Sequence, residues 1–268
     1  MIIQSIDRAL DILSLFSYAR PRWGITDIAL AMNLPKGTIH NIVSTLDSGG
    51  FLKKDEETRK YCLGPRVFSL GTIMGWTLEI NQKASGPAHS LVERTGLVCR
   101  VAIWDQDAAL STMEVTPHVR NALAQRIGPR VVAYCSALGR SLLANLTSSE
   151  IKAYLDRTEL VPFTPKTIVK RDLLLEELEQ TKTRGYAVNN EEIALGRASL
   201  STTIFGSGRR LAGAISQTGS PEQILGSEME SLIRTLRDTA GEISMALGYY
   251  PATTDQIKDS SKKKSIRK

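Results

Sequence analysis

The first fifty residues consist of short segments in which apolar positions recur at helical spacing, separated by tight turns. Apolar side chains repeat at intervals of three and four residues over 6–16, 28–32 and 39–46, which predicts three amphipathic helices. Gly49-Gly50 ends the third segment. The stretches FLKKD and KYCLG then flank a polar turn, EETR, and this pattern predicts a β-hairpin over 51–64.

The corner between the second and third segments has the spacing of a helix-turn-helix motif. Small Ala29 lies where the two helices would cross, and Asn33 follows at a turn position that favours a left-handed backbone. Apolar residues occupy the positions that this motif buries, namely Ile28, Met32, Leu34, Ile39 and Ile42. With the hairpin directly behind it, the motif predicts a winged helix-turn-helix, whose second helix enters the major groove of DNA.

The outer face of that second helix is polar, and its side chains are candidates for DNA contacts. Short polar side chains can meet base edges in the groove, and here they are Thr38, His40, Asn41, Ser44 and Thr45. Basic side chains of the helix start and the hairpin would meet phosphates, and they are Lys36, Lys53, Lys54, Arg59 and Lys60. Arg59, at the wing tip, could also enter a minor groove. The alternative is a solvated helix face. The winged motif favours double-stranded operator DNA as the partner.

Beyond residue 64 the apolar pattern predicts a mixture of helices and strands. PRVFSLGTIMGWTL is helical, and we interpret 64–78 as a linker helix between two domains. Two hairpins are predicted, from 97–104 with 108–115 and from 199–205 with 209–216. Further helical patterns lie at 137–146, 148–156, 170–184 and 221–248. This mixture predicts an α+β domain with one central antiparallel sheet.

Composition narrows the class of protein. The 268 residues are 42% hydrophobic and 23% charged, which is typical of a soluble protein with one large or two ordinary domains. The apolar runs are too short to span a membrane, and MIIQSIDRAL lacks the features of a secretory signal, so we expect no membrane partner. Cys62, Cys99 and Cys135 lack metal-ligand spacing and are interpreted as free thiols in a reducing cytoplasm.

The C-terminal segment differs in charge from the rest of the chain. The formal net charge is +6, and residues 252–268 alone carry six Lys/Arg against two Asp/Glu. The segment is polar and has no periodicity, which predicts a disordered basic tail over 251–268. Such a tail either contacts nucleic acid or only increases solubility.

An enzyme is the rival class of protein. The sequence has no phosphate-binding glycine loop with lysine, no nucleophile elbow and no His-Glu zinc motif, and its three histidines lie far apart. We therefore predict neither a catalytic site nor a cofactor. A third class is a DNA-binding protein whose sensor domain is degenerate and binds no ligand.

Several blocks of the sequence resemble the IclR (isocitrate lyase regulator) family of bacterial transcriptional regulators. SIDRALDILSLF and ITDIALAMNLPKGTIHNIVSTLDSGGFL resemble its DNA-binding domain, and CSALGRSLLANL, RGYAVNNEE and GRASLSTTIF resemble blocks of its effector domain. The resemblance implies a cytoplasmic regulator, associated with the nucleoid when bound to its operator, that forms homodimers or homotetramers. It also implies a winged helix-turn-helix domain at 1–63, the linker helix at 64–78 and a GAF-like effector-binding domain at 79–250.

The resemblance further implies a site for a small-molecule effector. The residues carried over by motif are Ala137, Leu138, Asn189, Arg197, Ser199, Ser216 and Thr218. Where relatives carry Asp, Cys and His groups that could hold a metal, this chain has Asn189, Ser199 and Tyr134, so we predict no metal. Hydroxyl and amide groups with one cation, Arg197, suit a small carboxylate or a hydroxylated organic acid. Alternatively, the strand hydroxyls bond the backbone and Arg197 points to solvent.

Overall fold

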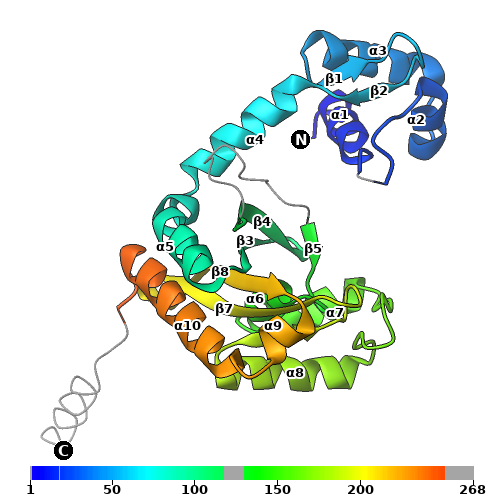
Figure 1. Cartoon of the computed structure of the whole chain (residues 1–268). Coiled ribbons are helices and arrows are strands. Elements are labelled where there is room, and N and C mark those ends of the chain that lie inside the picture. The colour runs from blue at the N-terminus through cyan, green and yellow to red at the C-terminus, as the bar shows by residue number, and fades with distance from the viewer. Residues whose placement is uncertain (1, 18, 118–129, 251–268) are drawn as a thin grey trace, which may run out of the picture. The chain divides into compact units, whose positions relative to one another are not determined.

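The computed structural model describes residues 2–17, 19–117 and 130–250 (Figure 1). These residues form two compact units, divided between Met74 and Gly75. The division falls inside the predicted linker helix, 64–78. The predicted disordered tail, 251–268, lies outside the described residues.

The N-terminal unit contains three helices followed by a two-stranded antiparallel hairpin. The elements are α1 (Gln4–Ser14), α2 (Ile25–Met32), α3 (Lys36–Ser48), β1 (Leu52–Lys54) and β2 (Tyr61–Leu63). The apolar stripes of the three helices meet in one core, which includes Ile12, Ile28, Ile39, Val43 and Leu52. The predicted winged helix-turn-helix is therefore confirmed as a fold.

The turn between α2 and α3 has the predicted left-handed backbone. Asn33 ends α2 with φ 51°, a conformation that asparagine tolerates better than most side chains. The Leu34 N–H then donates to the Ala29 carbonyl at 3.0 Å, and Ala29 is buried where α2 meets α3. The small residue and the turn residue thus fix the angle at which α3 leaves the corner.

A backbone bridge enlarges the wing beyond the predicted hairpin. Trp23 and Tyr61 exchange two hydrogen bonds, N–H to carbonyl, at 2.9 and 2.8 Å. The Trp23 indole N–H also donates to the Leu15 carbonyl at 3.1 Å. The segment before α2, which the sequence only marked as the end of the first helix, therefore attaches the wing to α1.

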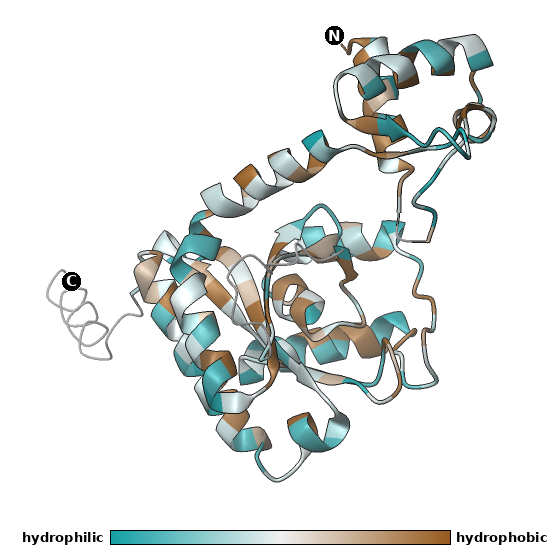
Figure 2. Cartoon of the chain, turned by 45° about the horizontal axis from the view of Figure 1, so that its top comes forward, coloured by the Kyte–Doolittle hydropathy of each residue, from teal (hydrophilic) through white to brown (hydrophobic). Residues whose placement is uncertain are grey.

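Helix α4 (Pro65–Thr77) follows the wing, within the segment 64–78 that the sequence predicts to be helical. None of its residues is buried, although it carries several large apolar side chains, and Figure 2 shows apolar (brown) segments along it. The exposed ones include Phe68, Leu70, Ile73 and Trp76. In the part of the chain that the structure describes, no helix is long and apolar enough to cross a membrane.

The C-terminal unit is built on one six-stranded sheet whose neighbouring strands are all antiparallel, as predicted. Its spatial order is β5-β4-β3-β8-β7-β6. The strands are β3 (Val98–Asp105), β4 (Ala108–Val115), β5 (Arg130–Val132), β6 (Ala187–Asn190), β7 (Ala198–Gly206) and β8 (Arg210–Gly219). Both predicted hairpins, β3-β4 and β7-β8, are confirmed, and the short 3₁₀ turn Ser207–Arg209 closes the second.

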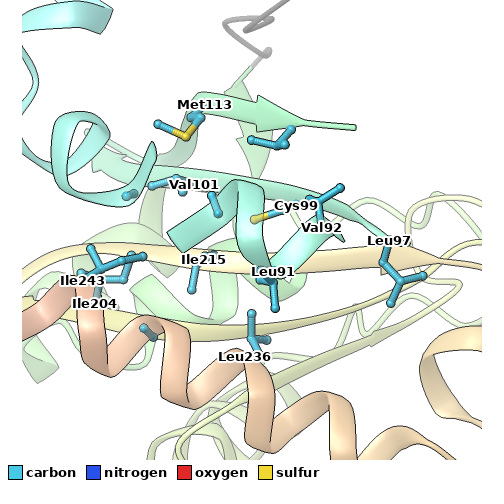
Figure 3. Packing of buried hydrophobic residues seen from close by; sticks show 14 of the residues in the cluster. Leu91, Val92, Leu97, Cys99, Val101, Met113, Ile204, Ile215, Leu236 and Ile243 are labelled. Carbon is cyan, nitrogen blue, oxygen red and sulfur yellow. The ribbon is translucent and has the colours of Figure 1, made fainter. Parts of the chain in front are cut away.

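Two helices cover one face of this sheet and hold the main hydrophobic core. They are α5 (Glu79–Thr95) and α10 (Met229–Ala246) (Figure 1). Side chains from both helices interdigitate with those of the inner strands, as Figure 3 shows for Leu91, Leu236, Val101 and Ile215. The core on this face is mainly apolar, and its buried polar side chains bond one another, as Thr112 does with Asn81.

The opposite face is covered by α6 (Ala137–Leu143), with α7 (Ser148–Arg157) and α8 (Arg171–Arg184) beyond it. The apolar contact between α6 and the sheet includes a small cluster in which Leu138 and Leu142 pack against Ala102, Ala109 and Ala214. Because the strand residues in this cluster are alanines, α6 packs close at its centre. The sheet beyond the N-terminal end of α6 carries polar side chains.

In this unit one predicted helix needs correction, and one observed helix was not predicted. The single helix expected over 221–248 is broken into α9 (Pro221–Leu225) and α10. At the break, Gly226 is extended, and a Cβ there would lie 2.3 Å from the Glu222 carbonyl oxygen. Helix α5 was not predicted at all, because Pro87 and many polar residues hide its apolar positions.

Candidate DNA-binding face and effector cavity

The polar residues predicted to meet DNA bases lie along α3. His40, Asn41, Ser44 and Thr45 are exposed, whereas Thr38 is half-buried. The Thr45 hydroxyl donates to the Asn41 carbonyl at 2.8 Å, so only its acceptor positions face outward. Asn41 has no side-chain hydrogen bond within the described residues, which makes its amide the most available group for a base edge.

The basic residues predicted to meet phosphates lie at the start of α3 and on the wing. Lys36, Lys53, Lys60 and Arg59 are exposed, and Lys54 is half-buried. Arg59 has φ 54° in the tight turn between β1 and β2. This geometry presents its guanidinium at the tip of the hairpin.

Asp55 organises that turn. Its carboxylate accepts the backbone N–H groups of Thr58 at 3.0 Å and Glu57 at 3.1 Å, and it pairs with Arg22 at 2.8 Å. The Thr58 N–H, with help from the Thr58 hydroxyl and Arg22, holds the pKa of Asp55 below its usual value. The ionised carboxylate therefore fixes the backbone that presents Arg59.

The C-terminal unit contains a cavity of about 410 Å³ on the sheet face that α6 covers. All seven residues predicted for the effector site line it: Ala137, Leu138, Asn189, Arg197, Ser199, Ser216 and Thr218. They come from α6, β6, β7, β8 and the loop before β7. The structure thus brings together residues that lie up to 81 positions apart in the sequence.

The strand register explains this convergence. Across the sheet, Asn189 pairs with Ser199, and Ser199 pairs with Thr218. One row further, Ser216 lies opposite Arg100, which lies opposite Glu114. Because side chains two residues apart on a strand share a face, both rows point to the same side of the sheet. Together they form the polar floor of the cavity.

A β-bulge adds a residue to this floor. Val101 pairs with Met113 but Ala102 pairs with Ser111, so Thr112 is an extra residue in β4. The bulge brings Ser111 onto the same face as Glu114, and both line the cavity. The Thr112 hydroxyl instead donates to Asn81 of α5 at 2.7 Å, on the opposite face.

Three arginines line the cavity, and they differ in their partners. Arg100 donates from Nε to Glu114 Oε2 at 2.7 Å. Arg130 pairs with Asp105 and, at 2.9 Å, with Asp107. Arg197 is exposed and its side chain has no ion pair or hydrogen bond with a described residue. Arg197 is therefore the cationic side chain of the cavity that has no counterion among the described residues.

The N-terminal end of α6 forms the wall of the cavity. The Ser136 hydroxyl accepts the Gly139 N–H at 3.0 Å and donates to the Val132 carbonyl at 2.7 Å, which caps the helix. Gly139 allows the close approach of the preceding loop, because a Cβ there would lie 2.3 Å from the Ala133 Cα. The helix start is thereby fixed beside the sheet.

Arg140 connects this helix to the β6 side of the cavity. Its guanidinium is buried, forms an ion pair with Glu192, and donates to the carbonyls of Tyr134 at 2.8 Å and Val188 at 3.1 Å. The neighbouring Asn189 amide donates to the Cys135 carbonyl. These bonds hold β6 against the start of α6, and they leave the Asn189 carbonyl oxygen available to the cavity.

The loop that carries Arg197 is fixed by a carboxylate at its start. Glu191 pairs with Lys166 and accepts the Gly196 N–H at 2.7 Å. The Lys166 ammonium, and then the Gly196 N–H, hold the pKa of Glu191 below its usual value. Arg197 therefore follows a loop whose ends, Glu191 and Gly196, are joined by a hydrogen bond.

Comparison with known proteins decides the family. Residues 76–245 match the model of the bacterial transcriptional regulator IclR C-terminal domain, and residues 5–56 match the IclR helix-turn-helix domain. The chain belongs to the IclR family. It is therefore a DNA-binding transcriptional regulator with an effector-binding domain.

Individual relatives of this IclR-family chain agree over nearly its whole length. The HTH-type transcriptional regulator XynR of Escherichia coli is 31% identical over 248 residues, which is 92% of this chain and 98% of XynR. The Thermotoga maritima IclR structure has a TM-score of 0.67 at 26% identity and covers 92% of this chain and 99% of its own. An IclR homolog of Microbacterium hydrocarbonoxydans, solved with 4-hydroxybenzoate, has a TM-score of 0.75 at 21% identity, with 91% and 98% covered.

This IclR-family cavity has additional lining residues that motif comparison missed. They include Arg100, Ser111, Glu114, Arg130, Ser136, Phe163 and Ile193. There was no clear signal in the sequence for Arg100 and Glu114 as a pair, because regular pairing from Asp105 and Ala108 would set Arg100 opposite Met113. Ser111 was also hidden, because simple alternation from Glu114 assigns it to the other face.

Potential metal ligands and nucleophiles of this IclR-family chain do not gather at the cavity. Among the described residues there is no group of three or more His, Cys, Asp or Glu side chains that could hold a metal. Burial raises the pKa of both the Cys99 and the Cys135 thiol to about 12. These thiols are therefore protonated near neutral pH.

Proposed function

We propose that this IclR-family regulator responds to a small organic acid bound in the cavity on the α6 side of the sheet, with its carboxylate on Arg197. The observation that carries the proposal is that Arg197 has no counterion among the described residues. The other two arginines that line the cavity each form an ion pair with a carboxylate. A guanidinium forms its strongest contacts with carboxylates, often through two parallel hydrogen bonds.

The remaining cavity groups support a ligand with several oxygen atoms. Ser199, Ser216 and Thr218 line the floor, and their hydroxyls make no hydrogen bond with a described residue. Ser216 is buried, so a partner for its hydroxyl must come from within the cavity. The Microbacterium hydrocarbonoxydans homolog was solved with 4-hydroxybenzoate, a small carboxylate, and a volume of about 410 Å³ accommodates molecules of this size.

The N-terminal unit supports a role on operator DNA in the cytoplasm, with association to the nucleoid. The exposed polar face of α3 and the basic wing match the contacts of winged domains with bases and phosphates. The proposed residues are those predicted from the sequence: Lys36, Thr38, His40, Asn41, Ser44, Thr45, Lys53, Lys54 and Arg59.

The exposed apolar side chains support self-association as a homodimer or homotetramer. Helix α4 exposes Phe68, Ile73 and Trp76, and α1 exposes Ile6 and Leu10, each by more than half of its surface. A helix that exposes several large apolar side chains is usually covered by a partner. A second copy would also supply the second helix that a two-fold operator requires.

We infer a sensing role rather than a catalytic one for the cavity. The protonated state of Cys99 and Cys135 near neutral pH argues against a thiolate nucleophile in this unit. The resemblance of the whole chain to proteins named as regulators agrees with that inference.

The test is binding of linear and aromatic mono- and dicarboxylates by calorimetry, with the full chain and two variants. Arg197→Met should lower the affinity of any bound carboxylate by about tenfold or more. Arg234→Met on the far side of the unit, where Arg234 is exposed on α10, is the matched control and should bind normally. Carboxylate binding that survives Arg197→Met would contradict the proposal. A chain that binds no carboxylate at all would match the alternative of a ligand-free sensor domain.

A further inference from the structure

Glu114 is the one carboxylate that lines the cavity, among the described residues. Its side chain is only 13% exposed. A largely enclosed carboxylate beside a site for an anion is unfavourable unless a cation compensates its charge, because like charges repel.

The two oxygen atoms of Glu114 differ in their bonding. Arg100 approaches only Oε2, from Nε and Nη2, each at 2.7 Å. Oε1 accepts no hydrogen bond from a described residue. The ion pair with Arg100 thus neutralises the charge of Glu114 and leaves one strong acceptor atom at the cavity.

Glu114 and Arg197 occupy opposite sides of the cavity floor. Glu114 lies on β4, whereas Arg197 immediately precedes β7, and β3 and β8 lie between them. Three strand spacings separate β4 from β7, or about 14 Å, and Arg197 is also four residues away along the chain from Ser201, the β7 residue in the row of Glu114. The two side chains fill part of that width, and the hydroxyls of Ser216 and Thr218 lie between them. A ligand that touches both ends needs a chain or a ring between two polar groups.

We propose that the effector carries a hydroxyl group, or another O–H or N–H donor, at the end opposite its carboxylate, and that Glu114 selects for this donor. This inference rests on the proposed function, because it takes the carboxylate to lie on Arg197. A donor satisfies Oε1 of Glu114, whereas a methyl group leaves it buried without a partner. A second carboxylate places two negative charges together and is rejected.

Because Arg100 lies beside Glu114, a mutation of Glu114 should change which ligand the cavity prefers. In the wild-type protein the charge of Arg100 is compensated by Glu114. Removal of the Glu114 charge releases a second cation at the far end of the cavity. A dicarboxylate then has a positive partner at each end, so the preference should change from a hydroxy acid to a diacid. A residue with a purely structural role would weaken all ligands alike.

The experiment uses two matched sets of acids and the full chain, with dissociation constants measured by calorimetry. One set is pentanoate, 5-hydroxypentanoate and glutarate; the other is benzoate, 4-hydroxybenzoate and terephthalate. In at least one set the wild-type protein should bind the hydroxylated acid about tenfold or more tightly than either companion. Glu114→Met should remove this preference and improve diacid binding. Glu114→Gln, which keeps an acceptor oxygen and the side-chain shape, should retain some hydroxyl preference and also admit the diacid.

The outcomes separate this inference from the proposed function. The role of Glu114 is overturned if no hydroxylated acid binds more tightly than its unsubstituted companion, or if the preference persists in Glu114→Met. In either case the proposed function still stands if other carboxylates bind and Arg197→Met weakens them. If Arg197→Met has no effect on any acid, the carboxylate site itself is wrong.

Discussion

Arg140 and Glu192 form a buried ion pair beside the effector cavity. Their side chains are 2% and 7% exposed, and the Arg140 Nη1 to Glu192 Oε1 distance is 2.6 Å. The same guanidinium donates to two backbone carbonyls, and Glu192 also accepts the Ile168 N–H. The pair therefore connects the start of α6, the β6 strand and the loop before α8.

Removal of one partner of this pair should destabilise the C-terminal unit strongly. In Arg140→Met the Glu192 carboxylate stays buried without its counterion, and such losses cost about 3–5 kcal/mol of unfolding free energy. Urea denaturation followed by circular dichroism measures the change. Arg171→Met is the matched control, because the exposed Arg171–Asp156 pair should contribute less than about 1 kcal/mol. Equal effects of the two variants would contradict the structural role given to Arg140.

Asn41 should contribute to the choice of operator sequence. Asn41→Ala removes an exposed amide on α3 and should reduce the discrimination between operator and non-operator DNA by about 1–3 kcal/mol. Affinity for non-specific DNA should change little. Fluorescence anisotropy with both DNAs gives the two constants, and an unchanged ratio would mean that Asn41 reads no base.

Arg59 should contribute to affinity without contributing to specificity. Its position at the wing tip favours contact with the DNA backbone, so Arg59→Ala should weaken binding to operator and non-operator DNA alike. The slope of log affinity against log salt should fall by about one. Asp55→Ala should have a similar effect through the wing turn that Asp55 holds together. A salt slope that stays the same in both variants would place the wing away from the DNA.

Only one of the three cysteines should react with a thiol reagent in the folded protein. Burial raises the pKa of Cys99 and Cys135 to about 12, whereas Cys62 lies half-buried on β2. At about pH 8, Ellman's reagent should titrate one thiol rapidly and the other two only after unfolding. Cys62→Ser should abolish the rapid phase. Rapid reaction of a second thiol would show that the core around β3 or α6 opens.

The hydrogen bond that holds the loop before β7 should depend on the ionised state of Glu191. The pKa of this carboxyl is lowered from its ordinary 4.5, so the folded form favours the charged state. The stabilisation is thus present above the ordinary pKa and is lost as the pH falls through the lowered one. An NMR titration of the Gly196 amide from about pH 6 to about pH 3 should show a midpoint below 4.5. Glu191→Gln should remove this titration, and a midpoint at or above 4.5 would contradict the assignment.

The N-terminal unit was predictable because its signals are local. Helical spacing, the turn residue Asn33 and the hairpin pattern all act within a few residues, and each appears in the structure as expected. The bridge between Trp23 and Tyr61 was missed because a single paired residue leaves no alternating pattern. Pairing over such a distance depends on the complete fold.

The C-terminal unit shows where sequence patterns stop being informative. The seven residues carried over by motif all line one cavity, but the motifs did not identify Glu114 or Ser111. Finding these two required the register between β3 and β4, and the register changes at a bulge that no local pattern marks. Helix α5 was missed although Ala84, Ala88 and Leu91 have helical spacing, because polar residues and Pro87 interrupt the pattern.

The bulge at Thr112 makes the chemistry of the cavity depend on the number of residues in β4 as well as on their kinds. If the same residues of β4 paired with β3 without the bulge, Ser111 and Glu114 would lie on opposite faces, because they are three positions apart. Either Glu114 or Ser111 would then leave the cavity without being substituted. The side chains that face the ligand are therefore set by the spacing of these residues together with the bulge, since deletion of Thr112 with loss of the bulge would keep both on one face. In a family built on this sheet, length variation in β4 is a route to a new effector that a comparison of aligned side chains would overlook.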